Sequence, residues 1–125
     1  MPNDPSTTST INLAIVRGTA SGPPELRQLA SGRRLATFAI RTHALAPPAT
    51  SVPVAVWDPP AWLETLEQGD VLVVAGCVRR RFYRAKSGTL EARVELEAVI
   101  VGRASDPRKL RRVRQFAETA LGTVG

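Results

Sequence analysis

The chain has 125 residues, with 17 Lys and Arg against 11 Asp and Glu, which gives a formal net charge of +6 at pH 7. This length allows one domain with a substantial core but not two, and no apolar segment approaches the roughly 20 residues that span a bilayer. A lone cysteine, Cys77, excludes a disulfide framework and a thiolate metal cage, and the excess of positive charge favours a polyanionic partner.

The amino-terminal segment, residues 1–10, contains neither a basic cluster nor an apolar stretch and so lacks the pattern of a secretory signal. We expect it to be a disordered leader, followed by one folded domain over residues 11–103. Residues 104–125 are predicted to form a basic helical extension. Without a secretory signal or a membrane span, the protein is expected in the cytoplasm, with no membrane partner.

Two strands are predicted in the first third of the chain. The first covers residues 11–17, and a turn-rich break with two glycines and two prolines follows at residues 18–24. The second strand covers residues 35–42. Phe38 and Ile40 share one face of it, so both are expected in the core.

A third strand and a short helix are predicted next. The strand covers residues 52–57, and Pro53 within it predicts an edge strand or a bulge, because proline cannot donate to a sheet. The helix covers residues 61–67. Trp62 on this helix is expected to be half-buried, or alternatively to form a contact patch with Leu66.

A long β-hairpin is predicted from residue 71 onward. The apolar run at residues 71–78 changes abruptly into residues 79–86, where arginines alternate with aromatic rings. A Ser-Gly pair then supplies a turn, and residues 91–98 return with strict alternation of charged and apolar side chains. The tip of this hairpin is therefore expected to leave the core.

The alternation also predicts the register of the hairpin. An odd-numbered turn such as residues 86–88 sets Arg79 opposite Glu95 and Tyr83 opposite Glu91. In this register the apolar inner face consists of Val78, Val94 and Leu96.

Two interpretations of the hairpin remain open. Arginines interleaved with rings suit a single strand of nucleic acid, since guanidinium groups hold phosphates and rings stack on bases at about 1–3 kcal/mol per base. The same residues could instead form cross-strand pairs that only decorate the surface. The first is favoured because the acids nearby are too few for Arg80, Arg81, Arg84 and Lys86.

A carboxy-terminal helix is predicted after Asp106, a good N-cap that is followed by proline. Its apolar residues recur at helical spacing until Gly122, and five basic residues lie between them. Such a helix can pack on its own domain, pair with a partner helix or lie on an anionic polymer.

The order of three strands, a short helix and a long hairpin predicts an all-β fold, a five-stranded OB-fold barrel with the short helix between strands 3 and 4. The carboxy-terminal basic helix is added to it. An SH3-like barrel is the nearest alternative.

The ordered set of motifs resembles the bacterial single-stranded DNA-binding proteins over residues 11–102. In the first half, the residues that carry the likeness are Asn12, Gly18, residues 24–27, Ser31, Gly32 and residues 38–42. In the second half they are residues 54–57, residues 76–83, Ser87 and Gly88.

This resemblance implies that aromatic rings stack on bases while Arg and Lys contact phosphates. By it, Trp57 and Tyr83 match stacking aromatics at the end of the third strand and on the hairpin. Arg79 and Arg81 share the face of Tyr83 and would frame it. Basic residues near the tip, in the turn before the second strand and on that strand complete the set. The expected nucleic-acid-binding residues are Arg33, Arg41, Trp57, Arg79, Arg81, Phe82, Tyr83, Arg84 and Lys86.

The resemblance further implies a homotetramer that binds single-stranded DNA with little sequence preference and protects it during replication, repair or recombination. It places the protein at the nucleoid, with replication or repair proteins as further partners. Two features depart from the family. Its additional stacking tryptophans are missing from residues 44–49 and Ser51, and its acidic tail is replaced by the basic residues 111–125. The chain therefore resembles a specialised paralogue.

The sequence offers little support for an enzyme and leaves two other kinds of binding open. The single histidine, His43, has no plausible nucleophile partner, and no phosphate-binding glycine motif or metal-ligand cluster is present, so we expect no enzyme activity, catalytic residue, metal or cofactor. A protein-interaction module is the serious rival. RNA is an alternative ligand, because stacking and phosphate contacts alone do not distinguish it from DNA.

Overall fold

The computed structural model of the protein describes residues 10–43 and 48–122. The predicted leader therefore lies outside the described residues except for Thr10, as do residues 44–47 of the loop after the second predicted strand and residues 123–125. In chain order the elements are β1 (Ala14–Ala20), β2 (Glu25–Gln28), β3 (Arg34–Thr42), β4 (Thr50–Trp57), the 3-10 helix η1 (Ala61–Thr65), β5 (Val71–Arg84), β6 (Leu90–Arg103) and α2 (Pro107–Leu121).

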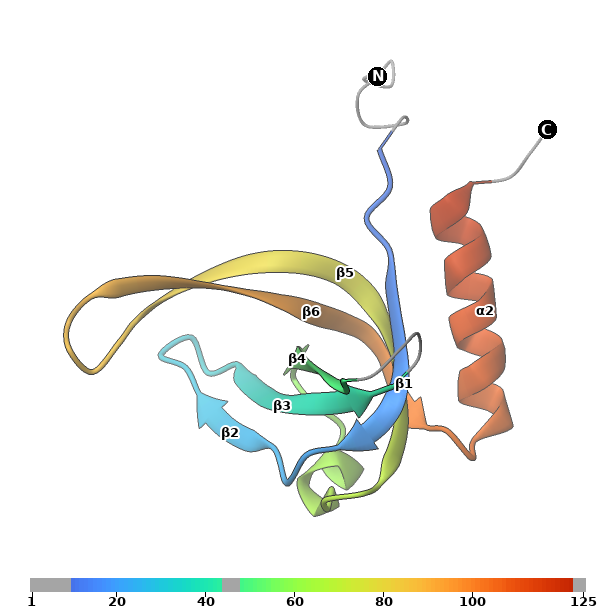
Figure 1. Ribbon diagram of the computed structural model, residues 1–125, viewed down its shortest axis with the longest axis horizontal. Coiled ribbons are helices and arrows are strands. Elements are labelled where there is room, and N and C mark those ends of the chain that lie inside the picture. The colour runs from blue at the N-terminus through green and yellow to red at the C-terminus, as the bar shows by residue number, and fades with distance from the viewer. Residues whose placement is uncertain (1–9, 44–47, 123–125) are drawn as a thin grey trace.

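The six strands form one sheet, and all of them except β2 pair in a closed ring (Figure 1). The order is β1-β5-β6-β4-β3-β2, and β1 also pairs with β3 at Thr19 and Ala20. All pairs are antiparallel except β4 with β6. The predicted all-β class is confirmed, and the closed circuit is compatible with a barrel-like fold. The described residues hold six strands rather than the five predicted, because β2 adds a strand beside β3.

Alternating side chains of the strands fill the inside of this circuit. Phe38 and Ile40 of β3 lie there, as predicted, opposite Val54 and Val52 of β4. The buried members of the core are Ala20, Ala36, Phe38, Ile40, Val54, Val56, Leu63, Leu66, Leu72, Val74, Leu96 and Val101. Leu63 and Leu66 come from η1 and the residue after it, so this short turn covers part of the core.

Several predictions about the first half of the chain are wrong in detail. The break placed at residues 18–24 begins too early, because β1 continues through Gly18. A Cβ at Gly18 would lie 2.2 Å from the backbone oxygen of Arg41, so glycine lets β1 and β3 approach each other. β4 is not an edge strand, since it lies between β3 and β6, but Pro53 falls just outside the two residues that pair with β6.

The short helix also differs from expectation. It is a five-residue 3-10 helix over Ala61–Thr65 instead of the predicted residues 61–67, and it follows the fourth strand, β4, because β2 adds one strand before it. Trp62 is half-buried, with the Arg103 guanidinium 4.9 Å from its ring centroid. Leu66 is fully buried, so the alternative of an exposed patch formed by Trp62 and Leu66 is wrong.

The carboxy-terminal helix α2 forms where predicted and packs on its own sheet. The Asp106 carboxylate accepts hydrogen bonds from the backbone N–H of Arg108 and Lys109, at 3.0 and 3.4 Å. Leu110, Val113 and Phe116 pack against Val73, Ala75 and Ile100 on the outside of β5 and β6. Figure 1 shows α2 on the opposite side of the molecule from the tip of the β5–β6 hairpin. No helix in the described part of the chain is long and apolar enough to cross a membrane.

Candidate nucleic-acid interface

The β5–β6 hairpin bends out of the sheet after a bulge. Pairing shifts between Ala75, which faces Ile100, and Gly76, which faces Ala98, so Val99 has no partner. A Cβ at Gly76 would lie 2.0 Å from the backbone oxygen of Glu97, and only glycine allows this approach. Beyond the bulge the two strands continue as a ribbon, and we call residues 79–95 the arm (Figure 1).

The predicted register of the arm is confirmed. Arg79 faces Glu95 and Tyr83 faces Glu91. The predicted burial of its apolar face is correct only for Leu96, because Val78 and Val94 are 47% and 54% exposed. These two valines continue the face that lines the core, but the arm has already left the sheet, so nothing in the described residues covers them.

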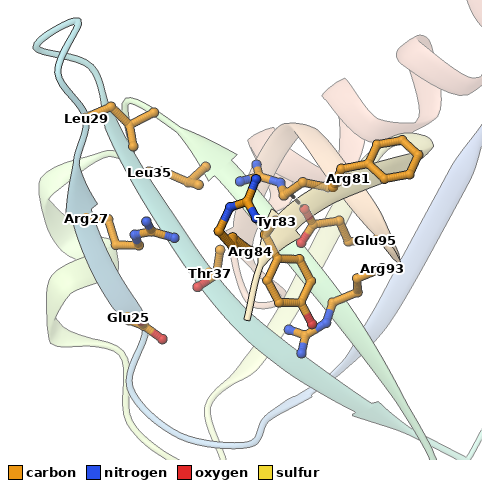
Figure 2. A pocket seen from close by; sticks show the side chains of 11 residues that line it. Glu25, Arg27, Leu29, Leu35, Thr37, Arg81, Tyr83, Arg84, Arg93 and Glu95 are labelled. Carbon is orange, nitrogen blue, oxygen red and sulfur yellow. Dashed lines mark ion pairs between the residues drawn. The ribbon is translucent and has the colours of Figure 1, made fainter. Parts of the chain in front are cut away.

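A groove lies between the other face of the arm and the strands β2 and β3. Its volume is about 520 Å³. Figure 2 shows Arg27 on one wall and Tyr83, Arg84 and Arg93 on the arm side, with Leu35 and Thr37 of β3 between them. The residues that line this arm groove are Glu25, Arg27, Leu29, Leu35, Thr37, Arg81, Phe82, Tyr83, Arg84, Arg93 and Glu95.

The charges of the arm groove do not cancel. Four arginines face two glutamates, and Glu95 is already paired with the Arg81 guanidinium. Glu95 is only 6% exposed, so this ion pair is largely buried where the arm begins. Loss of Arg81 would leave a buried carboxylate without its partner. Arg27, Arg84 and Arg93 form no ion pair with the described residues, which leaves their charges available to an anion.

Tyr83 is the aromatic ring of the groove with the most defined position. Its hydroxyl donates to the carboxylate of Glu91 at 3.1 Å, on the strand opposite. The Arg93 guanidinium lies 5.3 Å from its ring centroid, within the range of a cation–π contact. Tyr83 therefore presents a ring held in place between two strands.

Trp57 lies beside the arm groove, at the end of β4. Its Nε1 donates to Glu97 Oε1 at 2.9 Å. The guanidinium of Arg33 lies 4.5 Å from the Trp57 ring centroid and that of Arg81 lies 5.4 Å from it. Arg81 thus touches both the groove and Trp57.

Asp58 holds Arg33 in this position. Its carboxylate accepts from Arg33 Nε at 3.0 Å and from the backbone N–H of Arg34 at 3.2 Å. The hydrogen bond from the Arg34 backbone, followed by that from the Arg33 side chain, lowers the pKa of Asp58 below its usual 3.8.

Six of the nine predicted site residues lie in or beside the arm groove. Arg81, Phe82, Tyr83 and Arg84 line the groove. Trp57 and Arg33 adjoin it through Arg81, as described above. Phe82 is 61% exposed and points to the opposite face of the ribbon from Tyr83 by strand parity.

The other three predicted residues lie apart from the groove. Arg79 pairs with Glu97 at 2.8 Å, and a hydrogen bond with the Cys77 sulfur together with the Glu97 charge raises the pKa of Arg79. Lys86 is in the turn at the arm tip. Arg41 lies six residues beyond Leu35 on β3, roughly 20 Å along the strand. Of the four basic residues expected to outnumber the acids nearby, Arg81 forms an ion pair, with Glu95.

Arg27 and Arg93 belong to the groove but were missed by sequence reasoning. Arg93 lies opposite Arg81 in the register that the alternation predicts, so the pattern contained this information. Arg27 had no comparable pattern, because all four residues of β2 are exposed and the strand shows no alternation of burial.

The described residues contain no group of three or more His, Cys, Asp or Glu side chains arranged to hold a metal ion. A comparison of the sequence with protein-family models finds no match, and a search of curated proteins finds none either.

Proposed function

We propose that this protein binds single-stranded DNA with little sequence preference, in the arm groove. The observation that carries the proposal is the pairing of unneutralised arginines with a fixed ring, since Arg93 lies over Tyr83 and Arg27 and Arg84 line the same groove. Arginines contact the phosphates of any sequence and a ring stacks on any base. Neither feature reads base edges, which accounts for the expected lack of sequence preference.

The topology supports the finer part of the proposal, that the closed circuit of strands is an OB-fold. Folds of this kind bind oligonucleotides on a sheet face flanked by loops, one of which is the hairpin that corresponds to β5–β6. The arm groove occupies such a position, between the hairpin and β3. A homotetramer and a role in replication, repair or recombination remain expectations from the resemblance, and sedimentation tests the first of them.

Titration of the protein with oligo-dT, followed by tryptophan fluorescence, tests the proposal. Trp57 is the expected reporter because Arg81 links it to the groove, whereas Trp62 lies against the core. We expect quenching that persists in the presence of duplex competitor and weakens as salt is raised. Oligo-U in place of oligo-dT tests the RNA alternative. Absence of binding at low salt would contradict the proposal.

Tyr83 offers a variant that separates stacking from folding. Tyr83→Ala is expected to lose about 1–3 kcal/mol of single-strand affinity, because it removes one stacking platform. Tyr83→Phe keeps the ring and removes only the hydrogen bond to Glu91, so it should bind nearly as the parent does. Equal affinity of Tyr83→Ala and the parent would show that the ring carries no base.

A protein-interaction module remains a second candidate, and a different face of the arm favours it. Val78, Phe82, Leu90 and Val94 are all exposed on the side of the ribbon that faces away from Tyr83. Exposed apolar residues gathered on one face are typical of a protein contact. Failure to bind any oligonucleotide, combined with a dependence of self-association or partner binding on Phe82, would favour this function.

A further inference from the structure

A second hollow lies beside Trp57. It is bounded by the end of β4, by β6 and by α2, and its volume is about 280 Å³. The residues that line it are Val56, Trp57, Asp58, Pro60, Ala98, Val99, Ile100, Val101, Lys109 and Arg112. Trp57 borders this α2 hollow, and Arg81 of the arm groove lies over the same ring. The two hollows are therefore linked through Trp57, which borders one and lies under an arginine of the other.

The bulge in β6 gives the α2 hollow an apolar surface. Val99 is the residue left without a partner between Ala98 and Ile100, and it is 64% exposed. A bulge turns a side chain away from the position that regular pairing would give it. Val99 and Trp57 thus provide apolar contact area outside the core, next to the helix.

The helix adds positive charge on the same side. Lys109 and Arg112 are three residues apart and therefore share a face of α2, and both line the hollow. Neither forms an ion pair with the described residues, and Asp58 is the single acid of the lining. Asp58 is already bound to Arg33, which leaves the two cations of α2 unneutralised.

We propose that the α2 hollow is a second binding site for the same nucleic-acid strand, which crosses Trp57 and continues along α2 with its phosphates on Lys109 and Arg112. This inference rests on the proposed function and extends it. Charge complementarity identifies the occupant, because an apolar surface bordered by two free cations suits a base with its adjoining phosphate. Arg81 lines the arm groove and lies over Trp57, which borders the α2 hollow, and this contact gives the direction of the strand.

Other basic residues of α2 provide a matched control. Arg114 lies two residues after Arg112, which turns it to the other side of the helix, and Arg111 is also directed away. Neither residue lines the α2 hollow. The variants Lys109→Gln/Arg112→Gln and Arg111→Gln/Arg114→Gln therefore remove the same charge from the same helix, but only the first pair removes it from the proposed site.

The experiment measures the affinity of the parent and both double variants for two oligo-dT strands over a range of salt concentrations. The strands have about 4 and about 16 nucleotides, the limits of a single OB-fold site. On the longer strand, Lys109→Gln/Arg112→Gln should lower the salt slope by about 1.4, since each lost phosphate contact on a single strand accounts for about 0.7. On the shorter strand it should bind as the parent does, and the control pair should leave both slopes unchanged.

Several outcomes would overturn the inference. Equal losses of slope in both double variants would mean that α2 acts only through its overall charge, and no loss in either would mean that it makes no contact. Because the Lys109 side chain rests on Gly102, the single variant Arg112→Gln serves as a second test that leaves this packing intact, with an expected loss of about 0.7. If the parent binds the short strand but length adds nothing, only this inference fails. If the parent binds neither strand, the proposed function fails with it.

Discussion

At the scale of single residues, Asp58 connects the end of β4 with the start of β3. Its backbone N–H donates to the Arg34 oxygen at 2.8 Å, while its carboxylate accepts from Arg33 and from the Arg34 backbone. Arg33 in turn covers Trp57. The position of a guanidinium over the tryptophan therefore depends on one ionised carboxyl group.

The lowered pKa of Asp58 leads to a prediction about pH. A carboxyl whose pKa is depressed by folding stabilises the folded state fully above its unfolded value of about 3.8, and this contribution is lost as pH falls through the lower folded value. Asp58→Asn removes the charge but tolerates the positive φ of 47° at this position. We expect the urea midpoint of the parent to fall more steeply than that of Asp58→Asn once the pH drops below 3.8.

Asp70 supplies the control for this measurement. Its pKa is also lowered, mainly by a hydrogen bond from the backbone of Glu67, but it lies beside Arg103 rather than Arg33. Protonation of Asp58 in the parent should release Arg33 from Trp57 and so change the fluorescence of this tryptophan. Asp70→Asn should keep this acid-induced change, and Asp58→Asn should lose it. Identical pH profiles of the parent and Asp58→Asn would contradict the role given to Asp58.

At the scale of elements, the bulge at Gly76 determines where the arm leaves the sheet. Gly76→Ala places a methyl group 2.0 Å from a backbone oxygen, so the bulge must shift, and overpacking of this kind typically costs about 1–3 kcal/mol of stability. Gly22→Ala is a suitable control, because nothing lies within 4 Å of its Cβ position and its φ is not positive. Chemical denaturation of both variants checks the prediction, and equal midpoints would contradict it.

The sequence of the arm predicts the pairing of its two strands but not the burial of their side chains. The register of β5 and β6 was predictable, because charged and apolar residues alternate strictly and a slip of one position would exchange the faces. The exposure of Val78 and Val94 was not predictable from the sequence. A strand shows the same alternation of charged and apolar residues whether or not other residues cover its apolar face. β2 escaped prediction because a short, fully exposed strand has no apolar face to reveal it.

The candidate site was predictable only in the part that one segment contributes. Arg81 and Tyr83 lie two residues apart on one strand, so their common face follows from the hairpin alone. Arg27 reaches the same groove from β2, more than fifty positions earlier, and only the curvature of the sheet brings it there. Arg79 has the right parity, but Glu97 on the opposite strand engages its charge.

At the scale of the whole molecule, α2 is part of the folded unit and not an appendage. It covers Val73, Ala75 and Ile100 on the outer face of β5 and β6. Where α2 lies, the sheet thus has apolar residues on both faces: the inner face packs in the core and the outer face packs against α2. Unfolding of the helix would expose the outer layer, so helix and sheet are expected to unfold in one transition.

Two variants of α2 test this coupling. Val113 is 7% exposed and Leu121 is 59% exposed, although both are apolar residues of the same helix. Val113→Ala should lower the free energy of unfolding by about 2 kcal/mol, through lost burial and a small cavity, while Leu121→Ala should have little effect. Coincident transitions by far-ultraviolet circular dichroism and tryptophan fluorescence are expected for both. Loss of helix at a lower denaturant concentration than loss of sheet would contradict a single cooperative unit.

Asn12 continues the pairing of β1 with β5 two positions further, to Val78, through its side chain. Its amide donates to the backbone oxygen of Val78 and accepts from the Val78 N–H, both at 2.8 Å. Beyond this point no described strand pairs with the outer edge of β5. An open edge is a template for strand addition, and closely spaced charged side chains discourage it. The arginines of the arm therefore also protect the protein from edge-to-edge aggregation, whatever ligand they bind.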